Sequence, residues 1–113
     1  MKKTVSIIVP AFNEEELITI AYKAINDTLS ALDFDYEIVF VDDGSNDNTY
    51  AEIENLVSTG ATNVVGVSFS RNFGKEAAIF AGLREAKGDC CIVMDCDLQH
   101  PPASIPEMLR LWS

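Results

Sequence analysis

The sequence contains few basic residues, and this scarcity excludes several classes of partner. Among 113 residues there are eight lysines and arginines against 18 aspartates and glutamates, which gives a formal net charge of -10. Nucleic-acid-binding proteins replace phosphate counterions with cationic side chains, so a chain this acidic is not expected to bind nucleic acid. We also do not expect it to dock by charge on an anionic membrane. To bind a phosphorylated ligand it needs a metal cation or backbone N–H groups.

Other absences exclude further classes. No stretch approaches the roughly 20 apolar residues of a membrane-spanning helix, and the first apolar run ends at Pro10, too early for a secretory signal. The three cysteines, Cys90, Cys91 and Cys96, do not have the spacing of a disulfide framework or a zinc site. We expect them to be small apolar residues in a reducing cytoplasm. The single histidine, His100, has no evident nucleophile to serve, which argues against a Ser-His-Asp hydrolase.

Apolar runs and amphipathic segments alternate along the chain, which predicts an α/β fold. The predicted strands are residues 4–9, 36–41, 63–69 and 90–94, and the predicted helices are residues 14–32, 47–57, 74–87 and 102–112. In the second helix, Thr49 and Glu52 suggest a capping box, and Tyr50, Ile53 and Val57 an inner face. Near-continuous apolar strands separated by helices predict a mostly parallel sheet of about four strands with helices on both faces.

Polar residues follow each predicted strand, in residues 10–14, 42–45, 70–75 and 95–100. Ligands of open parallel sheets bind beyond the carboxyl ends of the strands. A turn or a helix cap could explain any one of these segments, but the four together predict a binding site at that edge.

The segment after the fourth strand has the pattern of a metal site. Asp95 and Asp97 are separated by one residue, and Gln99 continues the same spacing. Two carboxylates this close call for a compensating cation, and oxygen donors favour Mg²⁺ or Mn²⁺ over zinc. The alternative is an acidic turn that caps the next helix, because aspartate is common at turns. The residue pattern alone does not separate the two.

The segments after the second and third strands each allow two interpretations. One carboxylate of the pair Asp42 and Asp43 could accept a ring N–H from a nucleobase, or the pair could form an Asx turn or a helix N-cap. Arg71 and Lys75 could neutralise a diphosphate, or they could be ordinary surface charges. Gly74 at the start of the third helix allows close approach of an anion.

Four segments together resemble a known family. SIIVPAFNEEE, EIVFVDDGSNDNT, FSRNFGKEAAIFAGLREAKGD and VMDCDLQHPP, in this order, resemble the N-terminal half of a family-2, GT-A-fold glycosyltransferase. SRNFGKEAA and DLQHPP are similar in particular to the polyprenyl-phosphate glycosyltransferases, such as dolichol-phosphate mannose synthase and the bactoprenol glucosyltransferases. The resemblance implies that residues 1–113 form the Rossmann-like, nucleotide-sugar-binding half of the domain. It also implies that the acceptor half and any membrane segments are absent from this chain.

The resemblance assigns the nucleoside to the first two strand ends. Pro10, Phe12 and Glu14 would line the base and the ribose, with Phe12 standing where the family usually has tyrosine. Val41 and Asp43 would hold the base, Asp43 by accepting a ring N–H.

The resemblance assigns the metal and the sugar diphosphate to the fourth strand end. Asp95, Cys96, Asp97 and Gln99 match the family's D-x-D-x-Q segment, in which the acidic residues and the glutamine bind the metal and the sugar nucleotide. Asp97 would be catalytic, because a Mg²⁺ or Mn²⁺ ion on it stabilises the negative charge of the departing diphosphate.

The function that follows is transfer of a hexose from a UDP-glucose or GDP-mannose type donor to a polyprenyl-phosphate lipid. A lipid phosphate is already an anionic nucleophile and needs little general-base help. The full-length protein would work at the cytoplasmic face of the cell membrane, and a homo-oligomer is compatible with this. The alternatives are a family-2 transferase that acts on a saccharide hydroxyl and a truncated, non-catalytic nucleotide-sugar-binding module. A flavodoxin-like module leaves DLQHPP unexplained.

Overall fold

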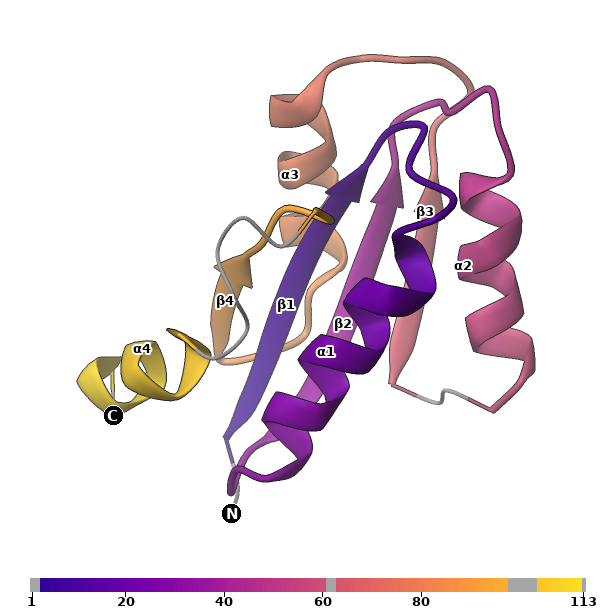
Figure 1. Ribbon diagram of the computed structural model, residues 1–113. Coiled ribbons are helices and arrows are strands. Elements are labelled where there is room, and N and C mark those ends of the chain that lie inside the picture. Colours follow the sequence, from indigo (N-terminus) through magenta and orange to yellow (C-terminus); the bar gives the residue numbers. More distant parts are fainter. Residues whose placement is uncertain (1–2, 61–62, 98–103, 113) are drawn as a thin grey trace.

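The computed structural model describes residues 3–60, 63–97 and 104–112, and this part of the chain contains four strands and four helices in alternation (Figure 1). In chain order they are β1 (Thr4–Ala11), α1 (Ile18–Ser30), β2 (Asp35–Asp42), α2 (Thr49–Ser58), β3 (Val64–Ser68), α3 (Lys75–Glu85), β4 (Cys90–Val93) and α4 (Ile105–Trp112). The strands form one sheet in the order β3-β2-β1-β4, and every neighbouring pair is parallel. The predicted α/β class and parallel sheet are confirmed.

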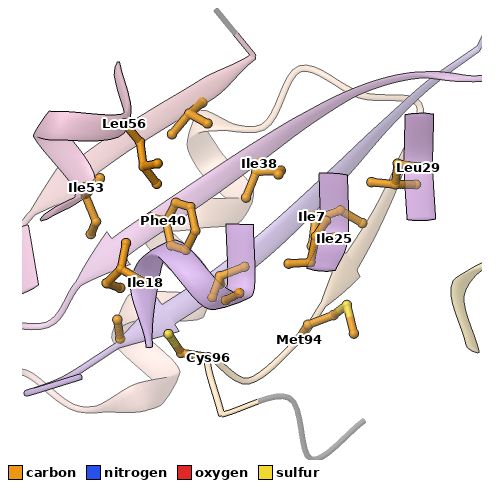
Figure 2. Packing of buried hydrophobic residues seen from close by; sticks show 14 of the residues in the cluster. Ile7, Ile18, Ile25, Leu29, Ile38, Phe40, Ile53, Leu56, Met94 and Cys96 are labelled. Carbon is orange, nitrogen blue, oxygen red and sulfur yellow. The ribbon is translucent and has the colours of Figure 1, made fainter. Parts of the chain in front are cut away.

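Helices cover both faces of the sheet. The main core lies between the sheet and α1, α2 and α4, and it contains Ile7, Ile25 and Phe40, all fully buried (Figure 2). A smaller core lies under α3 on the opposite face, where Ile8 packs with Ala78. Because successive side chains of a strand point to opposite faces, β1 needs apolar residues at nearly every position, which explains its continuous apolar run.

β1 continues through Pro10 to Ala11, two residues beyond its predicted end. The Ile8 carbonyl accepts the Met94 N–H, so the backbone N–H and C=O groups of Ile8 point toward β4. The backbone of Pro10, two residues further along the strand, has the same orientation. β4 ends at Val93, opposite Ile8. Pro10 therefore lies beyond the point where β1 needs an N–H donor on that side, and the strand tolerates it.

The predicted inner face of α2 is partly wrong. Thr49, Ile53 and Leu56 are buried, whereas Val57 is 46% exposed. The capping box is also wrong, since the helix N-cap is Asn48, whose side chain makes no cap hydrogen bond. The first buried residue of the helix, Thr49, is polar, so the spacing of apolar residues does not show which side of the helix is buried.

Other helices are shorter than predicted. α1 begins at Ile18 rather than residue 14, because residues 14–17 form a turn closed by a hydrogen bond from the Leu17 N–H to the Glu14 carbonyl. α3 ends at Glu85, and Ala86 is already extended. In α4, Ile105 and Leu109 are buried, whereas Met108 is 43% exposed. None of the helices described here is long and apolar enough to cross a membrane.

Candidate functional site

A cavity of about 290 Å³ opens at the carboxyl ends of β1, β2 and β4, beside the start of α3. It brings together most of the residues selected from the sequence. The residues that line it are Pro10, Ala11, Phe12, Glu14, Asp43, Lys75, Ala78, Asp95, Cys96 and Asp97. Segments more than 80 residues apart in the sequence thus meet at one edge of the sheet, as the parallel topology predicts.

Four carboxylates, those of Glu14, Asp43, Asp95 and Asp97, share this cavity with the ammonium group of Lys75. The Lys75 Nζ atom lies 2.5 Å from Asp95 Oδ1, and the hydrogen bond between them raises the pKa of Lys75. Burial raises the pKa of Glu14, the Phe12 N–H that its carboxylate accepts lowers it, and the charges of Asp97 and Asp95 raise it further. One basic side chain does not balance four acidic ones, so the cavity favours a further cation.

The donor chemistry of the site fits a hard divalent cation, because carboxylate oxygens are the ligands that Mg²⁺ and Mn²⁺ prefer. The described residues contain no group of three histidine, cysteine, aspartate or glutamate side chains arranged to hold a metal. Asp95 and Asp97 alone would therefore supply only part of a coordination sphere. Gln99, the third predicted ligand, lies outside the described residues.

Cys96 separates the two aspartates and lines the inner wall of the cavity. It is 2% exposed and packs in the main core with Met94 (Figure 2). Burial, together with the charges of Glu14 and Asp97, raises the pKa of its thiol to about 12. The thiol stays neutral at physiological pH, which suits a packing role at this position.

The two aspartates after β2 have different partners. The Asp42 carboxylate accepts the Ser45 N–H at 3.1 Å and also the Ser45 hydroxyl, and so holds the local turn. This N–H lies three residues along the chain, whereas an Asx turn uses the N–H two residues along. The Asp43 carboxylate accepts the Phe73 N–H at 2.8 Å and the Gly74 N–H at 3.0 Å. Asp43 thus joins the end of β2 to the start of α3. Its predicted contact with a nucleobase stays a prediction.

Hydrogen bonds also join the loops after β1 and β2. The Asn13 N–H donates to Ser45 Oγ at 2.8 Å, and the Asn46 N–H donates to Asn13 Oδ1 at 2.8 Å. Asn13 has a φ of 52°, a left-handed conformation that asparagine tolerates better than most residues. The Glu14 N–H donates to Thr49 Oγ1 at 2.9 Å. Sequence reasoning missed Asn13 and Thr49, although Asn13 in a loop after a strand was a usable signal.

Two predicted residues do not line the cavity. Val41 is fully buried in the core beneath α3. Arg71 is exposed, and its guanidinium carbon lies 4.9 Å from the centroid of the Phe73 ring. Their roles in donor binding stay predictions.

The family model "Glycosyl transferase family 2" matches residues 6–113. The "Prophage bactoprenol glucosyl transferase homolog" of Escherichia coli (strain K12) is 46% identical over 108 residues, which cover 96% of this chain and 35% of that protein. The "Undecaprenyl-phosphate 4-deoxy-4-formamido-L-arabinose transferase" of Pseudomonas fluorescens (strain SBW25) is 40% identical over 94% of this chain and 31% of its own length. The chain thus spans about a third of the length of the curated relatives it matches.

Two solved structures resemble the fold. The mannosyltransferase PcManGT from Pyrobaculum calidifontis, in complex with GDP-Man and Mn²⁺, superposes with a TM-score of 0.78 at 25% identity, covering 97% of this chain and 32% of that one. S. aureus TarS 1-349 in complex with UDP gives a TM-score of 0.65 at 30% identity, covering 86% of this chain and 28% of that one.

Proposed function

This chain belongs to glycosyltransferase family 2, and from that premise we propose that it is the donor-binding part of an enzyme that transfers a hexose from a nucleoside-diphosphate sugar to a polyprenyl phosphate. The observation that carries the proposal is the cavity in which Glu14, Asp95 and Asp97 gather around Lys75. The relatives named as bactoprenol and undecaprenyl-phosphate transferases support the acceptor, and the structures titled with GDP-Man and UDP support the donor.

In this proposal, Asp95 and Asp97 hold a Mg²⁺ or Mn²⁺ ion, with Gln99 as a further oxygen ligand. The neighbour titled with GDP-Man and Mn²⁺ supports a metal of this kind. Such an ion, when bound, stabilises the negative charge that develops on the departing diphosphate. Asp97 is the residue whose loss should affect this most.

The remaining side chains orient the donor. Lys75 donates from the Asp95 side of the cavity, where its ammonium group can move from the carboxylate to a phosphate oxygen. Phe12 is 41% exposed at the cavity and offers a ring face on which a base can stack. Glu14, which lies beside Phe12, faces the ribose.

The acceptor needs no strong base from this part of the chain. A phosphate oxygen of a polyprenyl phosphate is already charged and can attack the sugar carbon directly. An acceptor of this type resides in a membrane, so we place the full-length enzyme at the cytoplasmic face of the cell membrane.

Calorimetric titration of the chain with UDP-glucose and with GDP-mannose, with and without Mn²⁺, tests the proposal. We expect one donor to bind more tightly with Mn²⁺. Asp97→Asn should weaken that metal-dependent binding at least about tenfold, because even outer-shell partners of a bound metal are worth roughly 10–100-fold. Asp27→Asn, on an exposed position of α1, is the matched control and should bind like the unaltered chain. Equal affinities with and without Mn²⁺ would contradict the assignment.

A further inference from the structure

The start of α3 is held by a residue from another strand. Its N-cap, Gly74, has no side chain with which to cap the helix. The Asp43 carboxylate instead accepts the N–H groups of Phe73 and Gly74 and the side-chain amide of Asn72, the last at 3.1 Å from Oδ2. Asp43 is 4% exposed and is itself held to β1 by the bond from its N–H to the Ala11 carbonyl. The anchor at the end of β2 is therefore rigid.

These bonds occupy most of the acceptor sites of the Asp43 carboxylate. A carboxylate offers about four lone-pair sites. Phe73 and Gly74 both donate to Oδ1, and Gly74 and Asn72 both donate to Oδ2. The Gly74 N–H is shared between the two oxygens, so three donors depend on this carboxylate, and its loss would leave all three without their acceptor.

The residue that this anchor positions is Lys75. It is the first residue of α3 and directly follows Gly74, and its Nζ atom reaches Asp95 across the cavity. A lysine side chain has a long flexible stem, so the reach of its ammonium group depends on where its backbone is held. A loose start of α3 would let Lys75 leave Asp95 for solvent, since the Lys75 side chain is 59% exposed.

We propose that Asp43 is a positioning residue of the donor site, which holds the start of α3 so that the Lys75 ammonium stands at Asp95 beside the cavity. This inference rests on the proposed function, in which Lys75 donates to the diphosphate of a nucleoside-diphosphate sugar. Asp43 then contributes to donor affinity through Lys75, a role distinct from the direct base contact predicted from the sequence.

A double-mutant cycle separates these two roles. Asp43→Asn keeps the shape of the side chain but replaces one carboxylate oxygen with an NH₂ group, which cannot accept the N–H groups of residues 72–74. We expect it to weaken donor binding about tenfold, as loss of a charge-assisted hydrogen bond does, and to have almost no further effect in a Lys75→Met background. Equal losses in the two backgrounds overturn the proposal, because they show that Asp43 contacts the donor itself. The proposal also fails if Lys75→Met binds the donor normally.

Asp42→Asn is the matched control. Asp42 is as buried as Asp43 and likewise accepts a backbone N–H, but from Ser45. Its effect on donor affinity, whatever the size, should be the same with and without Lys75→Met. Should Asp43→Asn fail to fold, Asn72→Ala removes only the side-chain donor at an exposed position, and its smaller loss should vanish in the Lys75→Met background.

A readout without donor keeps this proposal separate from the proposed function. In the free chain, Asp43→Asn should shift the amide proton resonances of Phe73 and Gly74 and speed hydrogen exchange in the first turn of α3, more than Asp42→Asn does. Absence of donor binding by the unaltered chain contradicts the proposed function alone. Unchanged resonances and exchange at the start of α3 contradict the positioning role, whether or not a donor binds.

Discussion

Gly44 lies against the peptide bond that follows Arg71: a Cβ atom on Gly44 would stand 2.1 Å from the carbonyl carbon of Arg71. Gly44 also has a φ of 71°, in the left-handed region. The loops after β2 and β3 therefore meet backbone to backbone, next to the bonds that Asp43 makes. A side chain at this position has to displace the backbone of Arg71 and Asn72.

The first prediction concerns this close approach. Gly44→Ala should destabilise the fold by about 2–3 kcal/mol, because strain from the left-handed backbone adds to the clash with Arg71. Gly60→Ala is the control: Gly60 has a φ of 103°, but nothing lies within 4 Å of an added Cβ atom. Gly60→Ala should lower the free energy of unfolding only by the backbone strain, about 1–2 kcal/mol. Urea unfolding measures both, and equal losses would show that the contact with Arg71 does not matter.

The second prediction concerns a buried hydroxyl at the opposite end of the sheet. Ser6 is fully buried, donates to Glu37 Oε2 at 2.6 Å and accepts the Gly88 N–H at 2.9 Å. Ser6→Ala should lower the free energy of unfolding by about 1–3 kcal/mol, since two polar partners lose their bond. Ser58→Ala, which removes an exposed hydroxyl from α2, should change it by less than about 0.5 kcal/mol. Urea unfolding of both variants is the measurement.

The third prediction concerns thiol reactivity. With a pKa of about 12, Cys96 has a thiolate fraction of about one in ten thousand near pH 8, and its side chain is 2% exposed. Cys91 is exposed, and Cys90 is intermediate. Iodoacetamide followed by peptide mass spectrometry should show modification of Cys91 first and of Cys96 only after unfolding. Early modification of Cys96 in the folded chain would contradict its place in the core.

The fourth prediction follows from the raised pKa of Glu14, whose largest cause is burial. An acid whose pKa is higher in the folded chain is penalised there when ionised. The resulting loss of folding stability is complete above the pKa of Glu14 in the folded chain and absent below its pKa in the unfolded chain. In metal-free buffer, Glu14→Gln should therefore raise the melting temperature near neutral pH, and this gain should disappear at about pH 3, below the usual glutamate range.

Exposed Glu16 supplies the control for that experiment. Glu16→Gln should change the melting temperature little at either pH. A Glu14→Gln chain that melts earlier than the unaltered chain at neutral pH would show that the ionised carboxylate stabilises the fold, against its raised pKa.

The strands were predictable because both faces of the sheet are covered. Val5, Ile7 and Ile8 are all fully buried, and a strand buried on two faces is apolar at nearly every position, with the hydrogen-bonded Ser6 as the exception here. The helix phases were less predictable. In α2 the buried stripe starts at Thr49, whose hydroxyl bridges Asp47 and the Glu14 N–H. A polar residue that is buried because of a distant partner gives no local apolar signal.

The position of the site was predictable for a topological reason, since four loops follow four parallel strands at one edge. The partners of its residues were not. The bonds of Asp43 to residues 72–74 span about 30 positions along the chain, and no local pattern specifies them. The sequence therefore indicates which carboxylates gather at the cavity, but not which one faces a ligand and which one supports a loop.

The edge strand β4 has a consequence for handling the polypeptide. Cys90–Val93 carries no charge and no proline, and among the described strands it pairs only with β1. Natural sheets usually protect such an edge with a lysine, a proline or a bulge, because unpaired peptide groups recruit strands from other molecules. Mutual repulsion from a formal net charge of -10 opposes that recruitment. The colloidal behaviour of the chain thus depends on ionic strength, and added salt, by screening this repulsion, should bring aggregation that starts at β4.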